Sequence, residues 1–272
     1  MTSSKTPSKL LADSSRLTPG IHEMQLQGST YFLAAPECEQ VDQVIVLVHG
    51  VSRNVKGLIE SFWPLIRKSR IALLAPRFDV SNYRDFQRLG RSGKGPRADL
   101  ALIAMLSELK LMTGWPTDKV LMFGHSAGAQ FVQRFLFAHP NRVIKAALSA
   151  AGCYTFPVNR NYPAGIQISS ELPGVHFEPQ RFLRIPTAVF IGLEDTLRDE
   201  SLNRSRRVDK QQGTTRLERA RRWVQAMQKA SAKHGLKRTC ELFEITGVCH
   251  DYPKAVSSAQ LNQWVFVWLQ SL

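Results

Sequence analysis

The sequence predicts an α/β fold with a mostly parallel sheet and helices on both of its faces. Apolar, often β-branched runs such as 43–50 and 119–125 alternate with segments of helical periodicity along the chain. These runs are nearly continuous, which is typical of strands buried on both faces. With 272 residues, of which 43% are hydrophobic, the chain can bury one large core. We therefore expect a single domain over residues 21–272, preceded by a flexible polar lead-in at residues 1–20.

The first half of the chain is expected to open with two paired strands. Apolar and polar side chains alternate in residues 20–28 and 30–37, and Gly28 lies between the two runs, which favours an antiparallel pair. Buried strands and amphipathic helices follow, with a polar loop rich in glycine and arginine at residues 79–97. The elements predicted in this half are strands at 20–28, 30–37, 43–50 and 70–78 and helices at 57–69 and 98–114.

The second half continues the alternation but contains one long irregular segment. Residues 153–185 are rich in proline and show no sustained period. Connections of this length in compact domains are usually functional, so we expect an insertion close to the site and a candidate cap over it. The other elements predicted in this half are strands at 119–125, 143–152, 187–195 and 239–250 and helices at 127–140, 215–235 and 257–272.

The charge of the chain is strongly positive, with a formal net charge of +14 at pH 7. Much of the excess lies in residues 197–223, where acidic residues are interleaved, which favours a solvated, salt-bridged surface over a nucleic-acid site. We expect no nucleic-acid partner, although the charge could attract anionic partners or acidic substrates. No apolar stretch reaches 18 residues, so no membrane span is expected.

The start of the chain and its cysteines bear on the compartment. Residues 1–20 are polar and lack the apolar core of a signal peptide, so we expect a cytoplasmic protein. The four cysteines show neither paired spacing nor a dense framework, which favours reduced thiols.

The pentapeptide Gly124-His125-Ser126-Ala127-Gly128 lies between the strand predicted at 119–125 and the helix predicted at 127–140. A strand that turns into a helix within about one residue projects the serine hydroxyl from the sheet edge, and side chains two positions before and after it would collide across the turn. The two flanking glycines fit that requirement. This context predicts that Ser126 is a nucleophile presented on a strained elbow.

A serine hydroxyl needs a base, and the base needs a carboxylate to orient it. His250 follows the last predicted strand and is the preferred base, with His176 in the insertion as the alternative. Asp195 follows the strand at 187–195 and is the preferred acid; a helix N-cap is the other role open to it. Three further carboxylates lie near these positions and are weaker candidates for the acid: Glu194, Asp199 and Asp251.

Negative charge develops on the oxygen of the substrate carbonyl when the serine attacks it, and two backbone N–H groups are expected to stabilise this charge. One is expected from Ala127, which follows the nucleophile at the start of a helix. The other is expected from Val51, which follows His49-Gly50 at the end of the strand at 43–50; Gly50 permits a tight turn there.

Four motifs follow one another in the chain: LVHG at 47–50, GHSAG at 124–128, IGLED at 191–195 and GVCHDY at 247–252. In their order and spacing the chain resembles the α/β-hydrolase superfamily over nearly its whole length. Residues 75–87, residues 95–109 and the HGVSRN stretch at 49–54 are similar to esterases related to polyhydroxybutyrate depolymerases and feruloyl esterases. The resemblance implies a central eight-stranded sheet, a Ser-His-Asp triad, an acyl-enzyme intermediate, and neither metal nor other cofactor. It assigns the nucleophile to Ser126, the base to His250, the orienting acid to Asp195 and the oxyanion donors to Val51 and Ala127.

These observations predict a serine hydrolase of carboxylic esters with a small-molecule ester as its substrate. The same triad could serve a thioesterase, lactonase, peptidase or acyltransferase, and a basic nucleic-acid- or surface-binding protein on a hydrolase scaffold is the alternative from another class. Substrate selection is expected from the 153–185 insertion and the 79–97 loop. Aromatic side chains of the insertion, among them Tyr154 and Phe156, would either line an acyl pocket or pin the insertion to the core. The residues predicted to contact substrate are Arg53, His125, Tyr154, Phe156 and His176.

Overall fold

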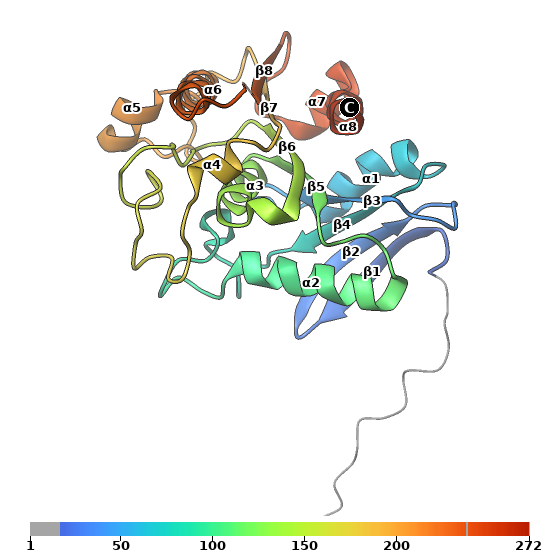
Figure 1. The fold of residues 1–272 in the computed structure, drawn as a ribbon. Helices are drawn as coiled ribbons and strands as arrows, with labels where there is room; N and C mark the ends of the chain where they lie inside the picture. Colours follow the sequence, from blue (N-terminus) through green and yellow to red (C-terminus); the bar gives the residue numbers. More distant parts are fainter. Residues whose placement is uncertain (1–16, 238, 272) are drawn as a thin grey trace, which may run out of the picture.

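The computed structural model of the chain describes residues 17–237 and 239–271 (Figure 1). Most of the lead-in predicted at residues 1–20 lies outside the described residues. Within the described part, eight strands form one sheet in the order β1-β2-β4-β3-β5-β6-β7-β8. The first two pairings, β1 with β2 and β2 with β4, are antiparallel, and all the others are parallel. The predicted eight-stranded, mostly parallel sheet and its antiparallel opening pair are therefore confirmed.

The strands are short and most are buried over almost their whole length, as the continuous apolar runs predict. The exceptions are β1 at one edge and β8 at the other, whose burial alternates or is partial. The bounds are β1 Gly20–Leu26, β2 Ser29–Ala35, β3 Gln43–Val48, β4 Ile71–Arg77, β5 Val120–His125, β6 Val143–Ser149, β7 Thr187–Gly192 and β8 Cys240–Ile245.

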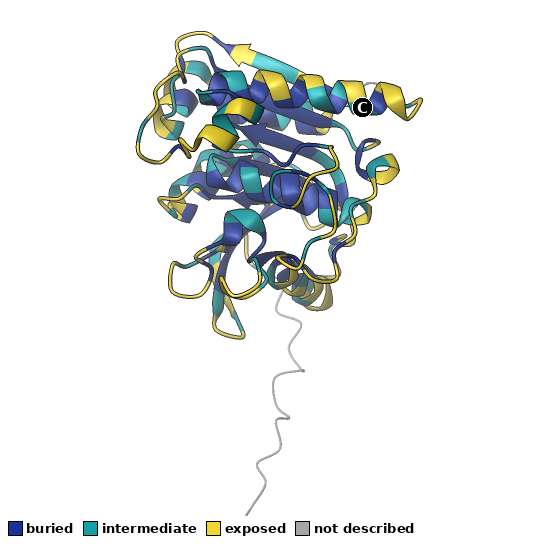
Figure 2. Cartoon of the chain, turned by 90° about the vertical axis from the view of Figure 1, so that its left-hand side faces the viewer, coloured by how far each residue is buried: buried dark blue, intermediate teal, exposed yellow. Residues whose placement is uncertain are grey.

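Helices cover both faces of the sheet (Figure 1). The helices α2, α3 and α6 bury their apolar sides against one face, and α1, α7 and α8 bury theirs against the other. Figure 2 shows the resulting layers, with buried strands between helices whose outer sides are exposed. The bounds are α1 Val55–Ile66, α2 Ala98–Thr113, α3 Ala127–Ala138, α4 Pro179–Phe182, α5 Arg206–Gln212, α6 Arg216–Lys233, α7 Tyr252–Ala259 and α8 Leu261–Gln270.

Local sequence signals place several of these helix starts. Asn54 accepts a hydrogen bond from the Gly57 N–H at the start of α1, and Thr215 accepts one from the Glu218 N–H at the start of α6. Asp251 caps α7 through the Lys254 N–H. The Asp251 carboxylate therefore caps a helix, and it is Asp195 that the His250 imidazole contacts.

Three helical segments differ from the expectation, one of them the short α4 inside the insertion that was predicted to be irregular. The closing helix predicted at 257–272 begins earlier and is divided into α7 and α8, because Gln260 adopts a left-handed conformation with φ of 53° between them. The short helix α5 was not predicted, since the charged residues 206–212 carry no apolar stripe.

The 153–185 insertion is attached to the core by buried polar contacts at its start. The backbone of Thr155 accepts a hydrogen bond from the Trp223 indole at 2.9 Å and another from the Gln133 amide at 3.2 Å, and its N–H donates to Gln133 at 3.0 Å. The Arg134 guanidinium donates to the Thr155 hydroxyl. The beginning of the insertion is thus fixed on α3 and α6.

Candidate active site

Ser126 lies between β5 and α3 in a strained backbone conformation, with φ of 57° and ψ of −114°. The approach of neighbouring backbone explains both glycines of the pentapeptide. A Cβ on Gly124 would overlap the Gly128 backbone and lie 2.7 Å from the Ala129 nitrogen. A Cβ on Gly128 would overlap the Val48 backbone at the end of β3 and lie 2.7 Å from the carbonyl oxygen of the next residue, His49. The turn therefore has the tight geometry that the sequence predicts, and it packs α3 directly on β3.

The imidazole of His250 lies between the Ser126 hydroxyl and the Asp195 carboxylate. The distance from Nε2 to the Ser126 Oγ is 3.1 Å, and the distance from Nδ1 to the Asp195 Oδ2 is 3.0 Å. The three residues follow β5, β7 and β8, so the carboxyl edge of the sheet brings together positions up to 124 residues apart. His176, the alternative base, lies exposed in the insertion.

The Asp195 carboxylate is buried, and a second charged group holds it from the opposite side. The Arg216 guanidinium approaches the Asp195 Oδ1 at 3.4 Å and forms two hydrogen bonds with Asp199, at 2.9 and 3.0 Å. Hydrogen bonds from Arg216 hold the pKa of Asp199 well below its usual range. Asp199, which was an alternative acid, therefore neutralises Arg216, and it is Asp195 that contacts the imidazole.

An aromatic ring packs against the His250 imidazole. The His125 ring stacks on it with 5.3 Å between centroids and packs against Tyr252 at 5.1 Å. Desolvation, together with the charges of His250 and Arg216, lowers the pKa of His125 to about 3. Tyr252 in turn shares a hydrogen bond with Ser61 on α1 at 2.8 Å. His125 thus packs beneath His250 as a neutral ring.

The loop after β3 lies beside the serine. A Cβ on Gly50 would be 3.6 Å from the Ser126 Cβ, which shows how closely this loop approaches the elbow. The buried His49 holds the loop from behind: its Nε2 accepts from the Phe78 N–H at 3.0 Å, so its Nδ1 carries the proton and donates to the Gly50 carbonyl at 2.8 Å. Burial lowers the pKa of His49 to about 4, which keeps this ring neutral.

The two predicted oxyanion donors belong to two different segments, the start of α3 and the loop after β3. Ala127 is the first residue of α3 and is buried, while Val51 is 54% exposed. Arg53, a predicted substrate contact, braces the loop: it donates to the Val51 carbonyl at 2.9 Å and to the Phe78 carbonyl at 2.7 Å. Its guanidinium also lies over the Phe86 ring, 5.7 Å from the centroid.

Among the other predicted substrate contacts, two lie in the core. Tyr154 is fully buried and stacks on Trp223 with 4.8 Å between ring centroids, and Phe156 is 6% exposed. Of the two roles open to these aromatic side chains, their burial matches that of pinning the insertion to the core.

Charged residues of the 197–223 stretch provide contacts that the sequence did not predict. That stretch was expected to be a solvated surface, but Arg216 and Arg219 are buried. Arg219 bonds to the carbonyls of Gly213, Gly152 and Asn203 and to Asp209. The available signal is their spacing on α6, where both arginines share a face with the buried Trp223.

Within residues 17–237 and 239–271, no cluster of three or more histidine, cysteine or acidic side chains could hold a metal ion. In the same residues no helix is both long and apolar enough to cross a membrane.

Solved structures share this architecture. Poly(aspartic acid) hydrolase-1 from Sphingomonas sp. KT-1 superposes with a TM-score of 0.77 at 22% identity, covering 92% of this chain and 100% of the other. A poly(3-hydroxybutyrate) depolymerase from Bordetella parapertussis superposes with a TM-score of 0.73 at 23% identity, covering 90% of each chain. An S-formylglutathione hydrolase from Agrobacterium tumefaciens superposes with a TM-score of 0.61 at 11% identity, covering 92% of this chain and 93% of the other. No family model matches the chain, and no curated protein does. The sheet order and these superpositions show that the chain has the α/β-hydrolase fold.

Proposed function

We propose that this chain is a serine hydrolase that cleaves carboxylic esters through an acyl-enzyme intermediate. The observation that carries the proposal is the His250 imidazole, within hydrogen-bonding distance of the Ser126 hydroxyl on one side and the Asp195 carboxylate on the other. The fold supports it, because similarly folded proteins are described as hydrolases of poly(aspartic acid), of poly(3-hydroxybutyrate) and of S-formylglutathione.

In the first half of the reaction, Ser126 attacks the ester carbonyl and His250 accepts its proton at Nε2. The Nδ1–H of His250 donates to Asp195, which fixes the tautomer and stabilises the imidazolium that forms. The N–H groups of Val51 and Ala127 donate to the oxygen that becomes negatively charged, and the α3 dipole adds to that stabilisation. His250 then returns the proton to the departing alcohol, leaving the acyl group on Ser126.

In the second half, a water molecule takes the place of the alcohol. His250 accepts a proton from this water, which attacks the acyl carbonyl and releases the acid and the Ser126 hydroxyl. Thioesters, lactones and activated amides would follow the same steps, so the acyl donor is decided by what binds around the serine. A basic surface-binding protein would not require an aligned imidazole, so the alignment favours the enzyme.

The proposal predicts that Ser126→Ala abolishes hydrolysis of p-nitrophenyl acetate. When the three residues act as a unit, loss of the nucleophile lowers turnover by about a millionfold. A fluorophosphonate probe should label the wild type and not the variant, and Ser257→Ala, at an exposed serine on α7, should behave as wild type. Wild-type rates in a pure preparation of Ser126→Ala, or a label on another serine, would contradict the assignment.

A further inference from the structure

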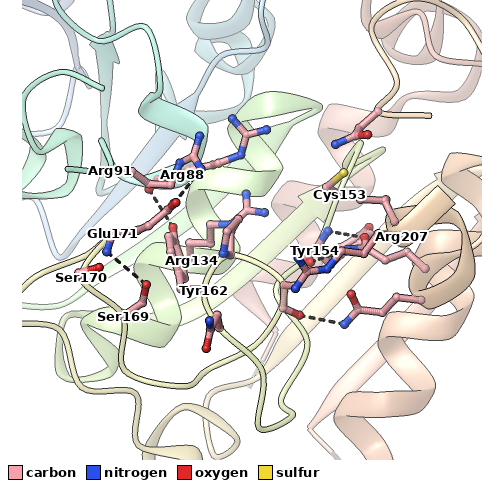
Figure 3. Close-up of a pocket in the computed structure, with 17 residues that line it drawn as sticks. Arg88, Arg91, Arg134, Cys153, Tyr154, Tyr162, Ser169, Ser170, Glu171 and Arg207 are labelled. Atoms are coloured by element: carbon pink, nitrogen blue, oxygen red, sulfur yellow. Dashed lines mark hydrogen bonds and ion pairs between the residues drawn. The ribbon is translucent and has the colours of Figure 1, made fainter. Parts of the chain in front are cut away.

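A cavity of about 510 Å³ lies between the 79–97 loop, the 153–185 insertion and the segment around α5 (Figure 3). In Figure 3, Arg88, Arg91 and Glu171 lie on one side of it, Arg134 near its middle and Arg207 on the opposite side. The loops that form it follow β4, β6 and β7, whose carboxyl ends lie at the same edge of the sheet as Ser126, although Ser126 itself does not line the cavity.

The arginines of this pocket differ in how their charge is balanced. Arg88 and Arg91 both pair with Asp85 at 2.8 Å, and Arg91 also pairs with Glu171 at 2.8 Å. Arg134 and Arg207 form no ion pair with any residue in 17–237 or 239–271. The pocket therefore presents two cations without a salt bridge to the described chain, and the carboxylate that acts on Arg134 at longer range, Asp85, is already paired with Arg88 and Arg91.

Arg134 is the more informative of these two, because it is only 1% exposed. Its Nε donates to the Thr155 hydroxyl at 3.0 Å, and its Nη1 donates to the Gln87 carbonyl at 2.6 Å and to Gln130. All of these acceptors are neutral, and Nη2 makes no hydrogen bond with the described residues. A buried cation without a counter-charge is unfavourable, and an anion beside it removes most of that penalty.

The position of Arg134 relates this pocket to the serine. Arg134 lies eight residues after Ser126 on α3, which is about 12 Å along the helix axis. A substrate with its scissile ester at Ser126 could place a group at its far end beside Arg134 and Arg207.

We propose that this pocket binds a carboxylate carried by the acyl part of the substrate, so that the preferred substrates are half-esters of dicarboxylic acids. The inference rests on the proposed hydrolysis at Ser126. Arg134 supplies a buried, desolvated donor, and Arg207 supplies an exposed charge at the mouth. Charge-assisted hydrogen bonds of this kind are stronger than neutral ones, so the free carboxylate is distinguished from an uncharged chain end.

The test compares two p-nitrophenyl esters of the same dicarboxylic acid. One is mono-p-nitrophenyl suberate, and the other is its methyl ester, in which the carboxylate is masked. The measured quantity is the ratio of kcat/KM for the charged ester to that for the masked ester. We expect the wild type to favour the charged ester, Arg134→Gln to lower the ratio by about tenfold or more, and Arg207→Glu to lower it by about fivefold. Arg206→Glu is the matched control: this exposed neighbour undergoes the same change of charge but does not line the pocket, so the ratio should stay at the wild-type value.

Each outcome separates the two proposals. A wild-type ratio near one, or an equal loss in Arg206→Glu and Arg207→Glu, overturns the carboxylate pocket and leaves the esterase proposal intact. If Arg134→Gln does not fold, the pair at 206 and 207 carries the test. If neither ester is hydrolysed, the proposed function fails. Calorimetric binding of the suberate dianion then decides on the pocket alone: binding weakened by Arg207→Glu but not by Arg206→Glu supports it, and no binding by the wild type overturns it.

Discussion

Gly128→Ala tests whether the contact between α3 and β3 positions Ser126, the proposed nucleophile. The added Cβ would lie 2.6 Å from the Val48 carbonyl carbon and 2.7 Å from the His49 carbonyl oxygen. The second distance is about 0.7 Å short of the 3.4 Å at which ordinary contact begins, and the Val48 oxygen is closer still. All of these atoms belong to backbone, so the start of α3 and the end of β3 must separate by about 1 Å.

The structure indicates what this separation does. Ser126 is two residues before Gly128, and Val51 is three residues after Val48, so movement on either side displaces the serine from the predicted oxyanion donor. A misplacement of about 1 Å can reduce catalysis roughly 100-fold. Overpacking of this kind also destabilises by about 1 to 3 kcal/mol. At about 2 to 4 °C for each kcal/mol, we expect Tm to fall by roughly 2 to 12 °C.

The assay is kcat/KM for p-nitrophenyl acetate together with thermal unfolding followed by circular dichroism. Gly152→Ala is the control, because the nearest atom to its Cβ is the flexible end of Gln130, at 3.3 Å. We expect Gly152→Ala to keep wild-type activity and Tm. If Gly128→Ala also kept both, the contact would not be what positions the serine.

Three further predictions follow from the charged groups around the site. Asp195→Asn should lower kcat by about 10⁴-fold because the imidazole loses its orienting acceptor, whereas Asp199→Asn, which does not contact His250, should cost far less; equal losses would refute the assignment of the acid. Arg216→Met should destabilise by about 3 to 5 kcal/mol, since it leaves a buried carboxylate without its cation; Arg222→Met, on an exposed turn of the same helix, is the control in thermal unfolding. The pKa of His49 is lowered to about 4 from 6.5, so the unfolded chain binds more protons between these values and stability should fall as pH is lowered through them. His49→Gln should flatten the fall of Tm over this window, and the exposed His234→Gln should not; matching slopes in both variants would argue against a neutral His49.

The sequence predicted those parts of the fold and the site that depend on local pattern. Short, β-branched apolar runs that alternate with helical patterns indicate buried strands, and the strand–glycine–serine–glycine–helix order is contained in a few residues around Ser126. Asp195 and His250 could be proposed from their places after particular strands, because the carboxyl ends of parallel strands lie at one edge of a sheet.

Other features could not be predicted because they depend on contacts between distant segments. An arginine is usually exposed, so Arg134, Arg216 and Arg219 are expected at the surface unless their distant partners are known. The left-handed residue Gln260 carries no glycine signal, so the helix predicted over 257–272 ran through it without a break.

Arg216 and Arg219 lie about one turn apart on α6 and hold different segments of the chain. The first holds the acidic residues after β7, and the second ties residues 203–213, which carry Arg207, to the end of β6. The orientation of the His250 imidazole and the width of the arginine-lined cavity thus both depend on the position of one helix, α6. A tilt of α6 would change the imidazole orientation and the cavity width together, so a substitution far along this helix would alter turnover and substrate preference at once.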